Sequence, residues 1–218
     1  FCLSNNIPLF QFEKVSRDGE DELKKLNADM FVTASFGQIL KQNILDIPPL
    51  GVINVHASLL PKYRGSSPIQ WAIMNGEKYT GITIMRTDIG LDTGDIYFSK
   101  KIDIDDNDTS SSVFNKLAIL GVECLHEFFE NYDYYKDKHF PQDEKNSSYY
   151  PMIKKEDFKL DFNLDAKTIF NKIRALEKCY FIYNSIRYIV GFANIVNLKG
   201  KVGEILSCDS KNGLVIAC

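Results

Sequence analysis

The chain has 218 residues, 44% of them hydrophobic, and a formal net charge of −3, which suits one α/β domain with a small second one. No stretch approaches the roughly 18 consecutive apolar residues of a membrane span, and residues 1–10 lack the basic start of a secretory signal. The five cysteines form no CxxC pair, which argues against a zinc site and a disulfide framework. We therefore expect a cytoplasmic protein without a metal site or a membrane segment.

Strands and helices alternate through the first part of the chain. Strand-like runs cover residues 30–36, 51–57, 81–87 and 95–104, and helical patterns cover residues 20–26, 66–76 and 109–132. The first two strand-like runs are almost wholly apolar, as is typical of strands buried on both faces. This alternation predicts an α/β fold with a mostly parallel sheet and helices on its faces.

The last third of the chain has a different character. Periodicity fails between residues 131 and 159, a polar, tyrosine-rich stretch with two prolines, which favours a linker. An amphipathic helix over residues 165–178 and short strands follow, with turns at Lys199-Gly200 and Asn212-Gly213. We expect a catalytic domain over residues 1–137, a linker over 138–158 and a β-rich second domain over 159–218.

The ends and the charge distribution add two expectations. The chain starts at Phe1 and stops within the strand-like run GLVIAC, so we interpret it as a segment of a longer polypeptide. Residues 151–218 hold 11 Lys and Arg against 7 Asp and Glu, a balance of +4, whereas residues 1–150 hold 15 against 22, a balance of −7. The basic end would attract a polyanion, and chance variation in a short segment is the alternative.

Two short stretches carry the chemistry. In GVINVHA, Asn54 and His56 share one face of a strand at its C-terminal end, where open α/β sheets bind ligands. An amide and an imidazolium are suitable donors for an oxyanion that develops on a carbonyl under attack. In the loop IGLDTGD, Asp92 supplies a carboxylate that would keep His56 protonated or relay a proton. An isolated Asp in such a loop could instead cap its own turn.

The residues around these stretches favour direct attack by an external amine on a bound acyl donor. The sequence contains no serine or cysteine in a nucleophile elbow, so covalent catalysis is not indicated. The loop SLLPKYRG provides an apolar pair, Leu59 and Leu60, with the rigid Pro61, which could hold a flat ring system. Lys62 and Arg64 could bind an anionic group of a substrate, and a structural ion pair is the equal alternative for Arg64.

The blocks NVHASLLPKYRGSSPIQWAI and TGITIMRTDIGLDTGDI resemble the methionyl-tRNA formyltransferases, the tRNA-directed branch of the folate-dependent formyltransferases. The resemblance implies that Asn54, His56 and Asp92 are the catalytic residues. It also implies that the formyl-folate site includes Ser58, Leu59, Leu60 and Pro61 together with a loop that lines the pterin pocket, Phe36, Gly37, Gln38, Ile39 and Leu40.

The same resemblance implies a function and a fold. The reaction would transfer a formyl group from 10-formyltetrahydrofolate, the co-substrate, to the α-amine of the methionine on initiator tRNA. The fold would be a Rossmann-like sheet without its N-terminal strands, joined to a truncated, OB-like C-terminal β-barrel that helps a monomeric enzyme to hold tRNA. Two alternatives stay open. One is transfer to a small acceptor, namely an amino sugar nucleotide, glycinamide ribonucleotide or water, and the other is a non-catalytic module that binds folate or tRNA.

Overall fold

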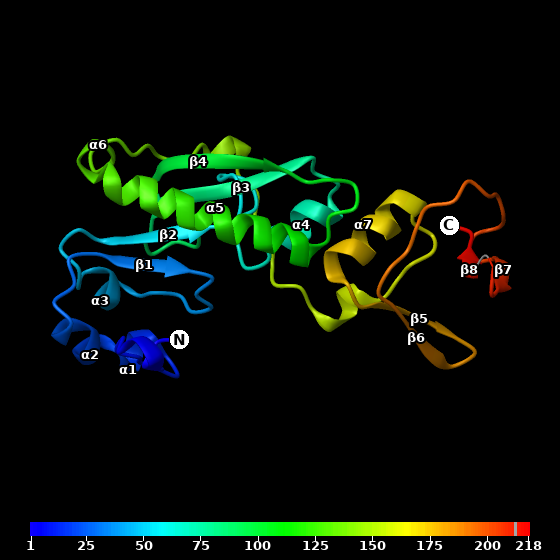
Figure 1. Cartoon of the computed structure of the whole chain (residues 1–218), viewed down its shortest axis with the longest axis horizontal. Coiled ribbons are helices and arrows are strands. Elements are labelled where there is room, and N and C mark those ends of the chain that lie inside the picture. The colour runs from blue at the N-terminus through cyan, green and yellow to red at the C-terminus, as the bar shows by residue number, and fades with distance from the viewer. Residues whose placement is uncertain (212) are drawn as a thin grey trace.

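The structure is a computed structural model that describes residues 1–211 and 213–218, so the turn expected at Asn212 falls partly outside the described residues. The molecule is elongated (Figure 1): a sheet covered by a long helix forms one end, and two β-hairpins form the other. Three short elements begin the chain, the 3₁₀ turn η1 (Leu3–Asn5), α1 (Val15–Asp18) and α2 (Glu20–Lys25).

A four-stranded sheet forms the framework of the site. Its order is β1-β2-β3-β4, made of β1 (Phe31–Ala34), β2 (Val52–His56), β3 (Tyr79–Arg86) and β4 (Ile96–Asp103). Strands β1 and β2 are parallel, whereas β2 and β3, and β3 and β4, are antiparallel. The four predicted strands are therefore present, but the prediction of a mostly parallel sheet is wrong, because the sheet is mixed.

The path of the connection between β2 and β3, residues 57–78, accounts for the mixed sheet. A parallel pair needs a crossover that returns the chain to the starting edge of the sheet. Helix α4 (Pro68–Met74) has 7 residues and spans only about 10 Å at 1.5 Å per residue. In this connection the chain turns back, enters β3 near the end at which β2 finished, and β3 runs antiparallel to β2. A nine-residue loop, residues 87–95, then joins β3 directly to β4.

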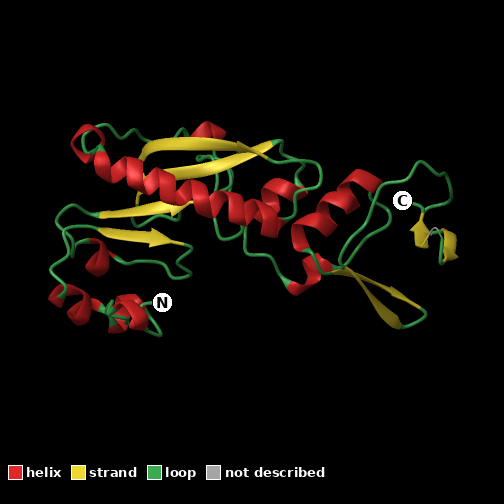
Figure 2. Cartoon of the chain, in the orientation of Figure 1, coloured by secondary structure: helices red, strands yellow, loops and turns green. Residues whose placement is uncertain are grey.

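Helix α5 (Ser110–Glu130) packs across β3 and β4 and encloses the main core (Figure 2). It begins with a capping box in which the Thr109 hydroxyl accepts a hydrogen bond from the Ser112 amide. Its buried stripe includes Val113, Leu117 and Phe128. Gly121 faces β2 so closely that a Cβ at this position would lie 3.3 Å from Cγ1 of Val55. A second, smaller core lies between α1, α3 (Gln42–Leu45) and β2, and contains Val15, Leu40, Ile44 and Val52.

The segment after α5 lies along the sheet and its loops. It includes α6 (Tyr132–Tyr135) and two 3₁₀ turns, η2 (Glu144–Asn146) and η3 (Lys155–Phe158). Isolated bridges pair Phe140 with Ile96 of β4 and Tyr149 with Arg64. The stretch expected to be a linker is therefore hydrogen-bonded to the sheet and to the loop after β2.

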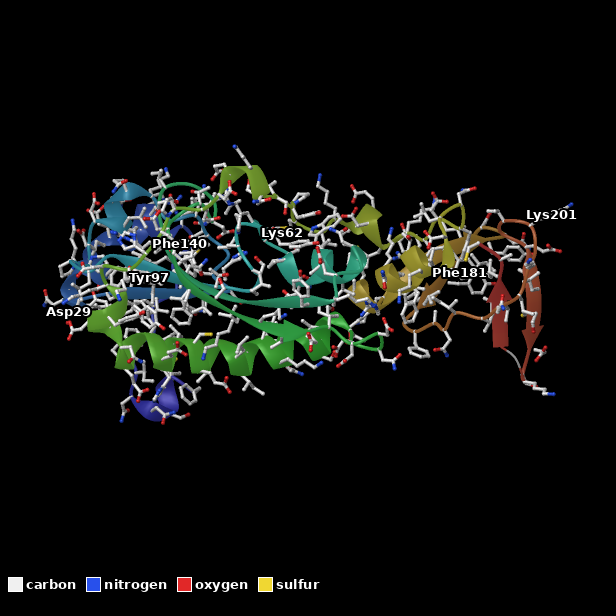
Figure 3. All side chains as sticks on the ribbon, turned by 90° about the horizontal axis from the view of Figure 1, so that it is seen from above. Asp29, Lys62, Tyr97, Phe140, Phe181 and Lys201 are labelled. Carbon is white, nitrogen blue, oxygen red and sulfur yellow. The ribbon has the colours of Figure 1, made fainter. Side chains whose placement is uncertain are left out.

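The C-terminal part begins with α7 (Ala166–Leu176), which packs against α4 (Figure 1). Two separate antiparallel hairpins follow, β5 (Cys179–Tyr183) with β6 (Ile186–Val190), and β7 (Ile205–Asp209) with β8 (Gly213–Ile216). In Figure 3 Phe181 of β5 lies far from Tyr97 of β4 along the molecule. Among the described residues these strands form no closed barrel, so the predicted OB-like barrel is not confirmed.

The described helices include none that is long and apolar enough to cross a membrane.

Candidate active site

The carboxylate of Asp92 lies between the side chains of Asn54 and His56. The Asn54 amide donates to Oδ1 of Asp92 at 3.4 Å, and Nδ1 of His56 lies 3.6 Å from the same oxygen. The other carboxylate oxygen accepts from the backbone N–H of Gly65 at 2.9 Å. The structure therefore brings together the amide, the imidazole and the carboxylate that the sequence singled out, from β2 and from the loop between β3 and β4.

The second nitrogen of His56 fixes the position of one ring proton. Nε2 of His56 lies 3.0 Å from the backbone carbonyl oxygen of Tyr63. A carbonyl oxygen only accepts hydrogen bonds, so Nε2 carries a hydrogen. Tyr63 offers this carbonyl from a left-handed conformation, with φ of 61°. Nδ1 is consequently the ring atom that faces Asp92, and a proton at Nδ1 would be directed toward the carboxylate.

The orientation of Asn54 is set from the neighbouring strand. Thr33 lies opposite Asn54 in the register of β1 and β2. The Thr33 hydroxyl shares its one hydrogen between Oδ1 of Asn54 at 3.1 Å and the Ile53 carbonyl oxygen at 3.2 Å. Since Oδ1 is taken, the NH₂ group of Asn54 is the end that points to Asp92. The sequence contained no local signal for Thr33, because its role depends on strand pairing.

The loop that carries Asp92 is tightly built. Asp92 itself has a φ of 54°, in the left-handed region, and the Asp88 carboxylate accepts from the Gly90 amide and the Thr93 hydroxyl. A Cβ at Gly94 would lie 2.0 Å from the carbonyl oxygen of Arg86. Gly94 therefore allows the close approach of two backbone segments at the base of the loop, and Asp88 has the turn-capping role typical of such residues.

The three side chains face a cavity of about 530 Å³. The predicted pterin-pocket loop forms part of its wall, with all five residues lining it: Phe36, Gly37, Gln38, Ile39 and Leu40. Further wall residues that the sequence reasoning missed include Ile69, Gln70, Met85, Thr87, Phe114 and Met152. They come from α4, from β3 and the loop after it, from α5 and from the segment after α5, and only the tertiary structure brings them to one place.

The segment Ser58 to Pro61 does not line the cavity. Leu60 is buried against Met85 and Ile96, and its amide donates to the Thr83 hydroxyl at 3.2 Å. The Ser58 hydroxyl donates to the Lys62 carbonyl at 2.7 Å, and the Leu60-Pro61 peptide bond is cis. These contacts hold the turn after β2 in place.

Of the two predicted anion-binding residues, Arg64 has protein partners. Its side chain is buried, and the guanidinium donates to Gln142 at 3.0 Å and to the two oxygens of Glu144 at 2.7 and 3.1 Å. The hydrogen bond from Arg64 also lowers the pKa of the Glu144 carboxyl. This arrangement is the structural ion pair that the sequence left as an alternative. Lys62 is exposed to solvent.

The described residues contain no group of three or more His, Cys, Asp or Glu side chains arranged to hold a metal ion.

Comparison with known proteins defines the class. Residues 8–128 match the formyl transferase family, and residues 152–218 match the formyl transferase C-terminal domain. The chain therefore belongs to the formyl transferase family. The chain is 39% identical over 225 residues to the methionyl-tRNA formyltransferase of Acetivibrio thermocellus, covering 100% of this chain and 72% of that protein. The predicted family resemblance is thus confirmed.

Solved structures share the fold. The methionyl-tRNA formyltransferase from Clostridium thermocellum superposes with a TM-score of 0.71 at 22% identity, over 89% of this chain and 83% of that chain. HypX from Aquifex aeolicus, solved in complex with tetrahydrofolic acid, gives a TM-score of 0.70 at 23% identity, over 87% of this chain. This chain spans 34% of HypX. At these identities the likeness concerns the fold.

Proposed function

We propose that this protein transfers a formyl group from 10-formyltetrahydrofolate to the α-amine of the methionine on initiator tRNA. The observation that carries the proposal is the convergence of Asn54, His56 and Asp92 on one cavity, in a chain whose relatives are named methionyl-tRNA formyltransferase. The site is the basis of the proposed chemistry, and the names of the relatives are the basis of the proposed acceptor.

In the proposed reaction the amine nitrogen attacks the formyl carbon and forms a new C–N bond. The carbonyl oxygen becomes an oxyanion, which would accept hydrogen bonds from the second hydrogen of the Asn54 NH₂ group and from Nδ1–H of His56. The oxyanion would share Nδ1–H with the Asp92 carboxylate, which lies 3.6 Å from Nδ1, because Nε2–H is held by Tyr63. The bond between the formyl carbon and N10 of the folate then breaks. The proton lost by the amine passes by way of Asp92 to N10, and tetrahydrofolate leaves.

The cavity supports a folate as formyl donor. A volume of about 530 Å³ lies within the usual range for small-molecule sites, about 300–1,000 Å³. Its wall combines apolar side chains such as Ile39 and Met85 with the polar site residues. We assign the pterin ring to the loop of residues 36–40, and we assign to residues 58–61 the supporting role that their contacts suggest.

The charge distribution supports a polyanionic acceptor. The basic region, residues 151–218, has a balance of +4, against −7 for residues 1–150. A basic surface attracts the phosphates of tRNA through counterion release. We therefore propose that the β-rich part of the chain, residues 159–218, helps to hold tRNA. We also propose that residues 1–137 form the catalytic domain. The exposed Lys62 would contact an anionic group of a substrate.

We also propose that the enzyme is a monomer in the cytoplasm. All five cysteines are free thiols, which agrees with a reducing compartment. Light scattering coupled to size-exclusion chromatography would test the monomer, which has a mass of 24.9 kDa for this chain.

A formyl-transfer assay tests the proposal. Labelled 10-formyltetrahydrofolate would be offered with methionyl initiator tRNA, with an amino sugar nucleotide, with glycinamide ribonucleotide, or with water alone. We expect label on the tRNA and a loss of about 10²-fold or more in kcat for His56→Ala. The control is His126→Ala, since His126 is exposed on α5. Label on a small acceptor would refute tRNA as the acceptor. Folate binding without any transfer would refute the proposed enzyme activity.

A further inference from the structure

Gln142 joins the two loops that build the site. It is one of the buried polar residues, with 9% of its surface exposed. Its side-chain NH₂ group donates to the carbonyl oxygen of Asp92 at 2.9 Å and to that of Gly94 at 2.8 Å. Its Oε1 accepts from Nε of Arg64 at 3.0 Å. Both hydrogens and one oxygen lone pair of the amide are therefore used within the protein.

The position of Gln142 in the chain makes this role unexpected. It lies between the two stretches that match the formyl transferase family, residues 8–128 and 152–218, in the stretch whose sequence favours a linker. Its partners are distant in sequence, 50 residues away at Asp92 and 78 residues away at Arg64. A residue from outside both matched stretches thus contacts the backbone of a site residue.

The neighbours of Gln142 hold it in place. Phe140 pairs with Ile96 through two backbone hydrogen bonds of 2.9 and 3.0 Å. On the other side, the Arg64 amide donates to the Ser148 carbonyl and the Tyr150 amide donates to the Arg64 carbonyl, each at 2.9 Å. The segment is consequently hydrogen-bonded to β4 at a residue that precedes Gln142 in the chain, and to the loop after β2 at residues that follow Gln142. The Gln142 amide is fixed between these two anchors.

We propose that Gln142 is a positioning residue that keeps the Asp92 carboxylate between Asn54 and His56. It holds the backbone of the Asp92 loop against the Arg64 side chain, beside Gly65, whose amide binds the other oxygen of Asp92. Gln142 touches no reacting atom in this scheme, and its effect on catalysis rests on the proposed formyl-transfer function. Its effect on the loop does not depend on that function.

The chemistry of the amide suggests a sharp test. Gln142→Glu keeps the shape and the acceptor for Arg64 but replaces two donors with a carboxylate oxygen that faces two carbonyl oxygens. Gln142→Met keeps the approximate size, adds no charge, and serves as a second variant if the glutamate destabilises the fold. The matched control is Gln11→Glu, which makes the same chemical change at an exposed position.

The first readout uses the protein without substrates. Amide hydrogen exchange, followed by NMR, reports the hydrogen bond from Gly65 to Asp92. We expect the Gly65 amide to exchange at least tenfold faster in Gln142→Glu and Gln142→Met, and at the wild-type rate in Gln11→Glu. Wild-type protection of Gly65 in both Gln142 variants would overturn the proposal.

The second readout is kinetic. We expect kcat for formyl transfer to fall by 10- to 100-fold, on the order of what a misplacement of about 1 Å costs, with KM for 10-formyltetrahydrofolate within about threefold of wild type. An unchanged kcat in both variants would overturn the catalytic part of the inference. Absence of formyl transfer in the wild-type protein would instead refute the proposed function, and the Gly65 exchange rates would still decide whether Gln142 positions the loop.

Discussion

Nε2 of His56 and the backbone carbonyl oxygen of Tyr63 lie 3.0 Å apart. Because of this contact, the two nitrogens of the imidazole have different partners. Nε2 is engaged by the protein, and Nδ1 is left for Asp92 and for the oxygen of a bound formyl group. Because the acceptor is a backbone atom, no side-chain substitution at Tyr63 removes it directly, and the ring orientation depends on the turn after β2 as a whole.

Asp92→Asn tests the charge at the centre of the site. The asparagine keeps the shape and an oxygen for the Gly65 amide but loses the negative charge beside Nδ1 of His56. We expect kcat to fall by about 10²-fold or more, the usual contribution of a group that transfers protons, while folate affinity changes little. Steady-state kinetics and calorimetry with a folate analogue measure the two effects. Asp103→Asn, at an exposed position of β4, is the control, and equal kcat values for the two variants would contradict the role of Asp92.

Thr33→Val removes the hydroxyl that orients Asn54 and keeps the size of the side chain. Without the donor, Oδ1 of Asn54 loses its 3.1 Å partner and the amide can turn. We expect kcat to fall by about tenfold. Thr33→Ser retains the hydroxyl and should restore most of the rate. If the two variants have the same kcat, the orientation of Asn54 does not depend on this hydrogen bond.

Leu60→Ala and Ile39→Ala separate support of the site from contact with the folate. Leu60 is buried against Met85 and Ile96, so its truncation should lower the free energy of unfolding by about 2–5 kcal/mol. Ile39 lines the cavity and is 70% exposed without a ligand, so its truncation should change stability by less than about 0.5 kcal/mol. KM for the formyl donor should rise about tenfold in Ile39→Ala.

Urea unfolding and initial-rate kinetics measure these two quantities for each variant. A rise in KM without loss of stability in Leu60→Ala would show that Leu60 contacts the donor directly, as the family resemblance implies. It would contradict the supporting role that its packing indicates.

Glu177→Gln tests how pH affects the contact between α7 and α5. Burial alone raises the pKa of the Glu177 carboxyl, but hydrogen bonds from the Ser111 and Ser110 hydroxyls outweigh it and hold the pKa below its usual value of 4.5. A carboxyl with a lowered pKa in the folded state stabilises the protein above its unfolded pKa, and this contribution is lost as pH falls through the folded value.

The wild-type protein should therefore be more stable than Glu177→Gln by about 1 kcal/mol at pH 7, and the difference should shrink as pH falls below 4.5. Urea unfolding at pH 7 and at pH 3.5 measures it. Glu123→Gln, at an exposed position of α5, should show no such pH dependence. A difference that grows on acidification would contradict the assignment.

The sequence predicted the parts of the site that depend on local geometry. The alternation of a strand placed Asn54 and His56 on one face, and the glycine-rich loop marked Asp92. It did not predict Thr33 or Gln142, because strand register and a contact across 50 residues leave no local pattern. The sequence did not predict the mixed sheet, because strand direction depends on the path of residues 57–78 between β2 and β3. The packing of Leu60 against Met85 and Ile96 was not predictable either, because an apolar residue near a site can pack beneath it or line it.

The antiparallel pairing of β3 and β4 also bears on the order of folding. Their contacts run from Tyr79 with Asp103 to Met85 with Ile96, all within one short stretch of chain. Isolated hairpins form in about 1–10 μs, and contacts that close long loops form more slowly. The hairpin of β3 and β4 can therefore form early, as a nucleus onto which β2 docks, and we expect the contact between Gln142 and the Asp92 loop to be among the last to form. Slow steps in refolding should then appear as late recovery of activity in a chain whose sheet is already complete.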